Sequence, residues 1–276
     1  MGPDFICIGA QKAGTAWLSQ CLQVHPNLWN PGIKELHFFD GASFSDNEKK
    51  IYSASLSKRR LKKIKQKIKD GKLKITSELS QKIIKSQRIT FEDYLELFSL
   101  APNASKTWEI TPSYGSMGLN KLAKMNELLP HTKYLYILRD PVNRALSSLR
   151  MSLERRSKRG ESESMIIDRW LKMQLDRGRY SRHIPIMNQI LSNKEKIIYL
   201  PFGLVKSDPQ KFMRRIEEHL GIPQGDYNEL LSKPYHQTSK SVTIPAETKE
   251  HIERELRSEK EFIARFFGSD FSSNCT

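Results

Sequence analysis

Four short apolar runs stand out from an otherwise polar chain, and each has the length of a buried strand. Continuous apolar runs of this size are typical of strands covered on both faces of a parallel sheet. The first run ends in a glycine, which indicates a tight connection to the next element. The runs are residues 4–10, 106–111, 133–139 and 196–202.

Between and after these runs, apolar residues recur at helical spacing. Strands that alternate with helices predict an α/β protein, with a P-loop-like parallel β-sheet flanked by helices on both faces. The 276 residues suit one large α/β domain or two small ones, and we predict a single domain over residues 1–276. The predicted helices are residues 15–25, 118–129, 141–157, 163–176, 184–192, 208–220 and 246–267.

Residues 41–95 depart from this alternation, and we interpret them as a variable basic insertion. Residues 45–90 are polar and rich in lysine, most densely in "SKRRLKKIKQKIKDGKLK" at 57–74. Three apolar residues in this stretch share one helical face, which predicts a basic helix ending near Gly71. They are Leu61, Ile64 and Ile68. The stretch is either a solvated surface helix or a patch that faces an acidic substrate.

The net charge limits the classes of partner that we expect. A net charge of +15 and a pI near 9.7 favour nucleic acid, acidic polysaccharide, a phosphorylated cofactor or an acidic membrane face. Aromatic residues do not interleave with the basic ones, so we expect no nucleic-acid partner. The three cysteines lack metal-ligand spacing, which predicts buried thiols in a reducing compartment and no metal site.

No apolar run approaches the roughly 20 residues of a membrane-spanning helix. The N-terminal residues lead directly into the first predicted strand, without the basic and apolar regions of a signal peptide. We therefore expect a cytoplasmic protein, or a soluble catalytic domain of a longer one.

The segment "IGAQKAGTAW" at 8–17 contains the first candidate chemistry. Gly9 and Gly14 frame four residues, as in a phosphate-binding loop, but Lys12 lies inside the loop and Thr15 follows the second glycine. This breaks the G-x-x-x-x-G-K-[ST] pattern and disfavours magnesium-dependent phosphoryl transfer. The backbone N–H groups of residues 13–17 can still bind an anion at the start of a helix, with Lys12 as a point charge beside it.

A second motif, "YLYILRDPVNRALSSLRM" at 134–151, joins a strand to a helix. Asp140 suits the N-cap and Pro141 the first helical position. Arg139 ends the strand and Ser147 lies two turns into the helix. Both side chains are hydrogen-bond donors. Taken alone, they are either a strand-end salt bridge and a surface hydroxyl or a pair that binds one anion.

These two motifs, in this order, resemble those of sulfotransferases that use 3′-phosphoadenosine 5′-phosphosulfate (PAPS). "GAQKAGTAWL" resembles the 5′-phosphosulfate loop, and the Arg–Ser spacing resembles the 3′-phosphate site. "TSKSVTIP" at 238–245 resembles a late loop whose lysine, usually followed by glycine, closes over the nucleotide. The resemblance implies the sulfotransferase fold and release of adenosine 3′,5′-bisphosphate. It implies nucleotide contacts from Lys12, Ala13, Gly14, Thr15, Ala16, Trp17, Arg139, Ser147, Lys240 and Ser241.

"KELHFFD" at 34–40 resembles a motif of heparan-sulfate-type sulfotransferases and their bacterial relatives. The resemblance implies that Glu35 is the catalytic base, with His37 as the rival, and that Lys12 neutralises charge on the leaving group. If residues 34–39 are extended, Glu35 and His37 point to the same face.

"WEITPSYG" at 108–115 resembles another segment of the same branch. Ile110 occupies the position of that branch's catalytic lysine, which puts close substrate homology in doubt. Glu109 is either a second carboxylate near the acceptor or a residue bonded to a neighbouring loop.

Together these motifs predict sulfuryl transfer from PAPS to a hydroxyl or amine of a saccharide, glycolipid or metabolite, or to a carrier-bound hydroxyl. Two other functions remain open at this point. One is a P-loop nucleotide kinase or phosphotransferase, which would require Mg²⁺ and ATP. The other is a non-enzymatic polyanion-binding protein that uses the +15 charge.

Overall fold

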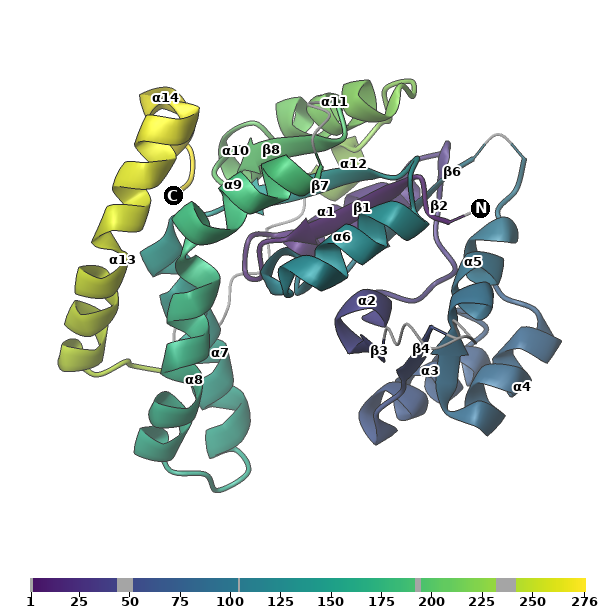
Figure 1. The fold of residues 1–276 in the computed structure, drawn as a ribbon, viewed down its shortest axis with the longest axis horizontal. Coiled ribbons are helices and arrows are strands. Elements are labelled where there is room, and N and C mark those ends of the chain that lie inside the picture. The colour runs from purple at the N-terminus through teal and green to yellow at the C-terminus, as the bar shows by residue number, and fades with distance from the viewer. Residues whose placement is uncertain (1, 44–51, 104, 192–194, 232–241) are drawn as a thin grey trace.

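A computed structural model describes residues 2–43, 52–103, 105–191, 195–231 and 242–276. Its centre is a five-stranded parallel sheet in the order β2-β6-β1-β7-β8 (Figure 1). The four predicted strands are confirmed, and the two-residue β2 is added at the edge. The strands are β1 (Phe5–Gly9), β2 (Leu28–Trp29), β6 (Lys106–Ile110), β7 (Lys133–Leu138) and β8 (Ile197–Pro201).

The central position of β1 explains its unbroken apolar character. All five of its residues are buried. β6 and β7 pair with it on either side, and a parallel sheet is covered by helices on its two faces. The carboxyl ends of β1, β6 and β7 lie at the same edge of the sheet, so the loops after these strands gather there. In open α/β sheets this edge is where ligands bind.

The seven predicted helices form, with ends within a few residues of the expected ones. Asp140 caps its helix by accepting from the N–H of Asn143 at 2.7 Å, and Asp208 does the same for Lys211 at 2.8 Å. These helices are α1 (Thr15–Val24), α6 (Leu119–Leu128), α7 (Pro141–Ser157), α8 (Glu163–Gly178), α9 (Tyr180–Ile190), α11 (Pro209–Leu220) and α13 (Ala246–Phe267). Short additions are η1 (Tyr114–Ser116), α10 (Leu204–Ser207), α12 (Asn228–Leu231) and α14 (Ser269–Ser273).

The predicted insertion forms a small unit on the opposite side of the central sheet from α7, α8 and α13 (Figure 1). Its three strands pair antiparallel in the order β3-β4-β5. Its elements are α2 (Phe38–Gly41), β3 (Ala42–Ser43), β4 (Ser53–Ser55), α3 (Lys58–Lys69), α4 (Ser77–Ser86), β5 (Arg88–Thr90) and α5 (Phe91–Ser99).

The basic helix predicted from the apolar spacing is confirmed as α3. Leu61 and Ile64 are buried in the core, whereas Ile68 is 37% exposed. Helices α4 and α5 were not expected from the sequence, although α5 begins with a capping box in which Thr90 and Asp93 bond each other's backbone N–H groups.

The condition for placing Glu35 and His37 on one face of a strand is not met, because residues 34–39 are not extended. Glu35 and His37 have left-handed backbone angles, with φ of 61° and 52°, and Phe38 begins the short helix α2. The segment is therefore a turn that runs into a helix.

Cys7, Cys21 and Cys275 are buried thiols, as expected. Among the described residues, no helix is both long enough and apolar enough to cross a bilayer.

Candidate active site

The loop between β1 and α1 has the backbone form of an anion-binding site. Lys12 and Gly14 adopt positive φ angles of 68° and 81°, so the chain turns sharply into α1. The first helical hydrogen bond runs from Leu18 N to Gly14 O at 3.0 Å. The N–H groups of Thr15, Ala16 and Trp17 therefore precede the helical ladder, at the positive end of the helix dipole.

The two glycines of this loop serve different purposes. Gly14 is in the left-handed region that favours glycine. Gly9 lies against the ring of Tyr136, and an added Cβ would overlap that ring. Trp17 packs edge-to-face against Phe212, with ring centroids 5.6 Å apart. The Trp17 side chain thus belongs to the core, and its backbone N–H is the group it offers to an anion.

The two predicted phosphate motifs meet. Arg139 Nη1 donates to the carbonyl oxygen of Lys12 at 2.6 Å, which joins the end of β7 to the loop after β1. The Lys12 ammonium lies 3.7 Å from the sulfur of Met151 on α7. Burial lowers the pKa of Lys12, and the nearby charges of Arg139 and Arg155 lower it further. An anion bound beside the Lys12 ammonium would offset the positive charges of Arg139 and Arg155 that act on it.

A third segment, 176–184, also reaches this loop. Arg177 Nη1 donates to Gln11 Oε1 at 2.5 Å, and the Tyr180 hydroxyl donates to the carbonyl oxygen of Arg139 at 3.0 Å. These residues belong to "DRGRYSRHI" at 176–184, which resembles the sulfotransferase segment that follows the 3′-phosphate helix, although no contact was predicted for either of them. Tyr180 thus holds the backbone of Arg139, and Arg177 holds the side chain of Gln11, the residue before Lys12.

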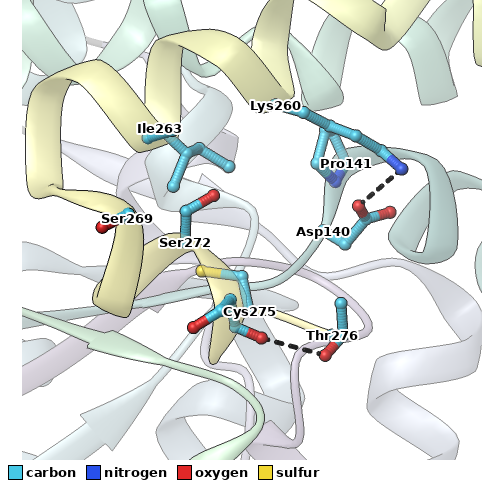
Figure 2. A pocket seen from close by; sticks show the side chains of 10 residues that line it. Asp140, Pro141, Lys260, Ile263, Ser269, Ser272, Cys275 and Thr276 are labelled. Carbon is cyan, nitrogen blue, oxygen red and sulfur yellow. Dashed lines mark hydrogen bonds and ion pairs between the residues drawn. The ribbon is translucent and has the colours of Figure 1, made fainter.

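The connection after Arg139 is anchored from the C-terminal side. Asp140 N donates to the carbonyl oxygen of Cys275 at 2.7 Å, and Lys260 Nζ lies 3.0 Å from Asp140 Oδ2. Figure 2 shows these residues around a cavity of about 330 Å³ between α13 and the start of α7. These contacts fix the strand-to-helix turn from which Arg139 projects. Ser147 is buried in the second turn of the same helix, α7.

Glu35 and His37 lie together, although not on a strand. His37 Nε2 is 3.7 Å from Glu35 Oε2, and His37 Nδ1 is 2.7 Å from Asp40 Oδ2. The Ser113 hydroxyl donates to the same oxygen of Asp40 at 2.5 Å. The imidazole is thus placed between two carboxylates. Asp40 is the last residue of the KELHFFD motif, and only the turn into α2 reveals its role.

The contacts of His37 and Glu35 determine their protonation states. Burial alone would lower the pKa of His37, but its hydrogen bonds to Asp40 and Glu35 raise that pKa to about 9. The interaction with His37 at 3.7 Å lowers the pKa of Glu35, and Lys34 contributes from 3.9 Å. At neutral pH, His37 is therefore protonated and Glu35 is ionised. Of the two, Glu35 is the one that can accept a proton.

Glu109 is a structural carboxylate rather than a group facing an acceptor. Its side chain is fully buried and accepts hydroxyl hydrogen bonds from Tyr94, Thr111 and Tyr114 at 2.5, 2.6 and 2.9 Å. Ile110, in the position of the branch's lysine, is also fully buried. Its carbonyl oxygen accepts from Glu35 N at 3.0 Å.

Helix α3 brings positive charge to the candidate base. The guanidinium of Arg60 acts electrostatically on His37 and Asp40, and the ammonium of Lys63 acts on Glu35. Lys67, on the same flank of the helix, donates to the carbonyl oxygen of Gly32 at 2.5 Å. One flank of α3 therefore faces the turn at residues 34–39, which we call the Glu35 turn. Lys240 and Ser241, predicted to close over the nucleotide, lie outside the described residues.

Comparisons with known proteins agree with the motifs. Mouse heparan sulfate glucosamine 3-O-sulfotransferase 3B1 is 25% identical over 236 residues, which cover 80% of this chain and 46% of that protein. The human 3A1 enzyme is 26% identical, with 80% and 44% covered. The chain thus spans about half the length of these curated relatives.

Solved structures support the fold. The sulfotransferase from Alicyclobacillus acidocaldarius superposes with a TM-score of 0.64 at 18% identity, covering 100% of both chains. The sulfotransferase domain from the curacin biosynthetic pathway gives a TM-score of 0.57 at 16% identity, covering 93% of this chain and 98% of that one. The predicted sulfotransferase fold is confirmed. A model of the sulfotransferase family matches residues 3–226, most of the chain, and the protein belongs to that family.

Proposed function

We propose that this protein transfers a sulfuryl group from PAPS to a hydroxyl or amine of an acceptor, with Glu35 as the base. The observation that carries the proposal is the hydrogen bond from Arg139 Nη1 to the carbonyl oxygen of Lys12 at 2.6 Å. It unites a helix N-terminus, an ammonium and a guanidinium at one edge of the sheet. Membership of the sulfotransferase family supports the same donor.

The donor set fits a nucleotide with two separate phosphate groups. The N–H groups of residues 15–17 and the Lys12 ammonium suit the phosphosulfate end. Arg139 and Ser147, on the β7–α7 connection, suit the 3′-phosphate. Bound PAPS would supply a sulfuryl group whose bond to the phosphate oxygen breaks, with the electron pair leaving on that oxygen, as the acceptor atom bonds to sulfur.

The residues of the Glu35 turn accept the proton that the acceptor releases and stabilise its charge. The ionised Glu35 carboxylate accepts the proton that the acceptor hydroxyl loses. The protonated His37, held by Asp40 at 2.7 Å, keeps Glu35 ionised and oriented. Lys12 neutralises the negative charge that develops on the leaving phosphate. The role of His37 is thus electrostatic rather than that of the base.

We further infer that the acceptor is a saccharide with an anionic group near the reacting hydroxyl. Lys34 and Lys63 act on Glu35, and Arg60 acts on His37 and Asp40, on the side of α3. An anionic group near the reacting hydroxyl would be attracted to this positive charge. The relatives named for heparan sulfate support a saccharide.

The test is a pair of assays. The first is calorimetric titration with adenosine 3′,5′-bisphosphate, with ADP plus Mg²⁺ as the comparison. The second is transfer from ³⁵S-labelled PAPS to heparan sulfate, chemically desulfated heparan sulfate and a neutral oligosaccharide. We expect tight, metal-independent binding of the bisphosphate and labelling of the anionic acceptors. Preference for ADP and Mg²⁺ would instead support a P-loop kinase, and binding without any transfer would support a polyanion-binding protein.

A further inference from the structure

The turn that carries Glu35 has a backbone that its own residues do not stabilise. Glu35 and His37 both lie in the left-handed region, which is unfavourable for residues with a Cβ. The next residues begin α2, whose N-cap His37 gives no side-chain hydrogen bond to the helix. The first N–H groups of a helix need acceptors, so something outside the turn must supply them.

The hydroxyl of Tyr114 supplies them. Phe38 N donates to the Tyr114 oxygen at 2.8 Å and Phe39 N at 3.4 Å. Tyr114 comes from η1, which follows β6, and is only 1% exposed. A single buried phenol thus caps the helix that immediately follows the candidate base and its histidine.

Glu109 fixes the direction of that phenol. Since the Tyr114 oxygen accepts from backbone N–H groups, its own proton points to Glu109 Oε1, 2.9 Å away. The Thr111 hydroxyl, which accepts from His37 N at 3.5 Å, also donates to Glu109 at 2.6 Å. Burial raises the pKa of Glu109, while the hydrogen bonds from Thr111, Tyr94 and Tyr114 lower it. Three hydroxyls therefore converge on this one buried carboxyl group and fix its orientation.

We propose that Tyr114, oriented by the buried carboxylate of Glu109, is a positioning residue that holds the Glu35 turn in its reactive place. The proposal rests on the function proposed above only in taking Glu35 as the base. The role of Tyr114 as the cap of α2 is independent of that function. Tyr114 touches no reacting group and acts through the backbone of Phe38 and Phe39.

The chain offers a matched control in Tyr94. Tyr94 is also fully buried and also donates to Glu109, at 2.5 Å. Its ring stacks on Phe38, with centroids 4.9 Å apart, while the ring of Tyr114 packs edge-on against Phe39 at 5.7 Å. Replacing either tyrosine by phenylalanine keeps the ring and removes one bond to Glu109, but only Tyr114→Phe removes the acceptor for the α2 amides.

The experiment compares Tyr114→Phe with Tyr94→Phe by amide hydrogen exchange and by kinetics. For Tyr114→Phe we expect exchange at Phe38 and Phe39 to rise at least about tenfold, as the loss of a buried hydrogen bond implies. Turnover of ³⁵S-labelled PAPS, with heparan sulfate or water as acceptor, should fall about tenfold. The KM for PAPS and the affinity for adenosine 3′,5′-bisphosphate should not change. Tyr94→Phe should leave both exchange at these amides and turnover unchanged.

Equal exchange at Phe38 in the two variants would overturn the proposal. Wild-type turnover of Tyr114→Phe, in an assay where Glu35→Gln is inactive, would also overturn the proposal. That result would leave Glu35 as the base. If Glu35→Gln is fully active, the proposed base fails, and the exchange data still decide the role of Tyr114. If Tyr114→Phe does not fold, exchange in the wild-type protein decides: a Phe38 amide as fast as an exposed one refutes the cap.

Discussion

The ring of His37 lies with Nδ1 2.7 Å from Asp40 Oδ2, and its opposite nitrogen faces Glu35. A histidine between two carboxylates is stabilised as the imidazolium. The relationship separates the two candidate bases, because the residue that holds the proton cannot take another. Asp40 therefore keeps His37 protonated, and the charge of His37 keeps Glu35 ionised.

Glu35→Gln should abolish most of the activity without affecting the nucleotide. We expect turnover to fall by roughly 10²–10⁴-fold, the usual contribution of a general base, with the affinity for adenosine 3′,5′-bisphosphate unchanged. Transfer from ³⁵S-labelled PAPS and calorimetry measure the two quantities. Glu127→Gln, at an exposed ion pair on α6, is the control. A Glu35→Gln enzyme that keeps wild-type turnover would remove Glu35 from the mechanism.

The pH dependence of activity should be broad and should end on the alkaline side with His37. The pKa of Glu35 lies below its ordinary 4.5, so the proposed base stays ionised down to acidic pH. The pKa of His37 is raised from 6.5 to about 9. Its contribution to folding stability is therefore complete below pH 6.5 and is lost as the pH rises through about 9.

The rate profile and a urea-unfolding series against pH test this expectation. Asp40→Asn removes one carboxylate from His37, so the alkaline limb should move toward lower pH. An alkaline limb near pH 6.5 in the wild-type protein would show that His37 is not held as the cation.

Arg139 and Ser147 should govern nucleotide affinity more than turnover. A charged hydrogen-bond donor is worth about 1.5–3 kcal/mol, so Arg139→Ala should weaken binding of adenosine 3′,5′-bisphosphate about 10- to 100-fold. Ser147→Ala should weaken it less, since a neutral hydroxyl contributes about 0.5–1.5 kcal/mol. Titration with 5′-AMP, which lacks the 3′-phosphate, is the control, and its affinity should be little changed by Ser147→Ala. Equal losses for both nucleotides would place Ser147 away from the 3′-phosphate.

The two flanks of α3 should differ in their effect on the acceptor. Arg60→Ala/Lys63→Ala removes the charges that face the Glu35 turn, and we expect the KM for heparan sulfate to rise about tenfold or more. Lys62→Ala/Lys65→Ala removes the same net charge from the other flank, where both residues line a separate groove. That variant should change the KM little.

Ionic strength provides a second measurement of the same surface. Exposed charges are screened within about 10 Å at 0.1 M salt, so added salt should raise the KM of the wild-type protein more than that of the Arg60/Lys63 variant. Identical behaviour of the two double variants would argue against a site-facing flank.

Local motifs were the part of this protein that the sequence could predict. Residues 9–17 and the Arg139 connection lie within single strand-to-helix turns, so neighbouring residues determine them. The helix α3 could be predicted from the spacing of Leu61 and Ile64. Its orientation could not, because that depends on tertiary contacts such as the one from Lys67 to Gly32.

The Glu35 turn shows why the remainder could not be predicted. Positive φ angles at two ordinary residues are imposed by contacts with β6 and Tyr114, which are distant in sequence. The local sequence left the backbone of residues 34–39 open, and tertiary hydrogen bonds determine it. The role of Glu109 was left open for the same reason, since only burial distinguishes a scaffold carboxylate from a reactive one.

The enclosure of Ile110 limits how this enzyme could be redesigned. Its side chain is fully buried at the last position of β6, and an ammonium placed there would lose its hydration at a cost of several kcal/mol. A lysine at position 110 would therefore add an ammonium group and lower the stability of the fold. A change of acceptor range is better sought at the partly exposed Lys34, which lies beside the proposed base Glu35.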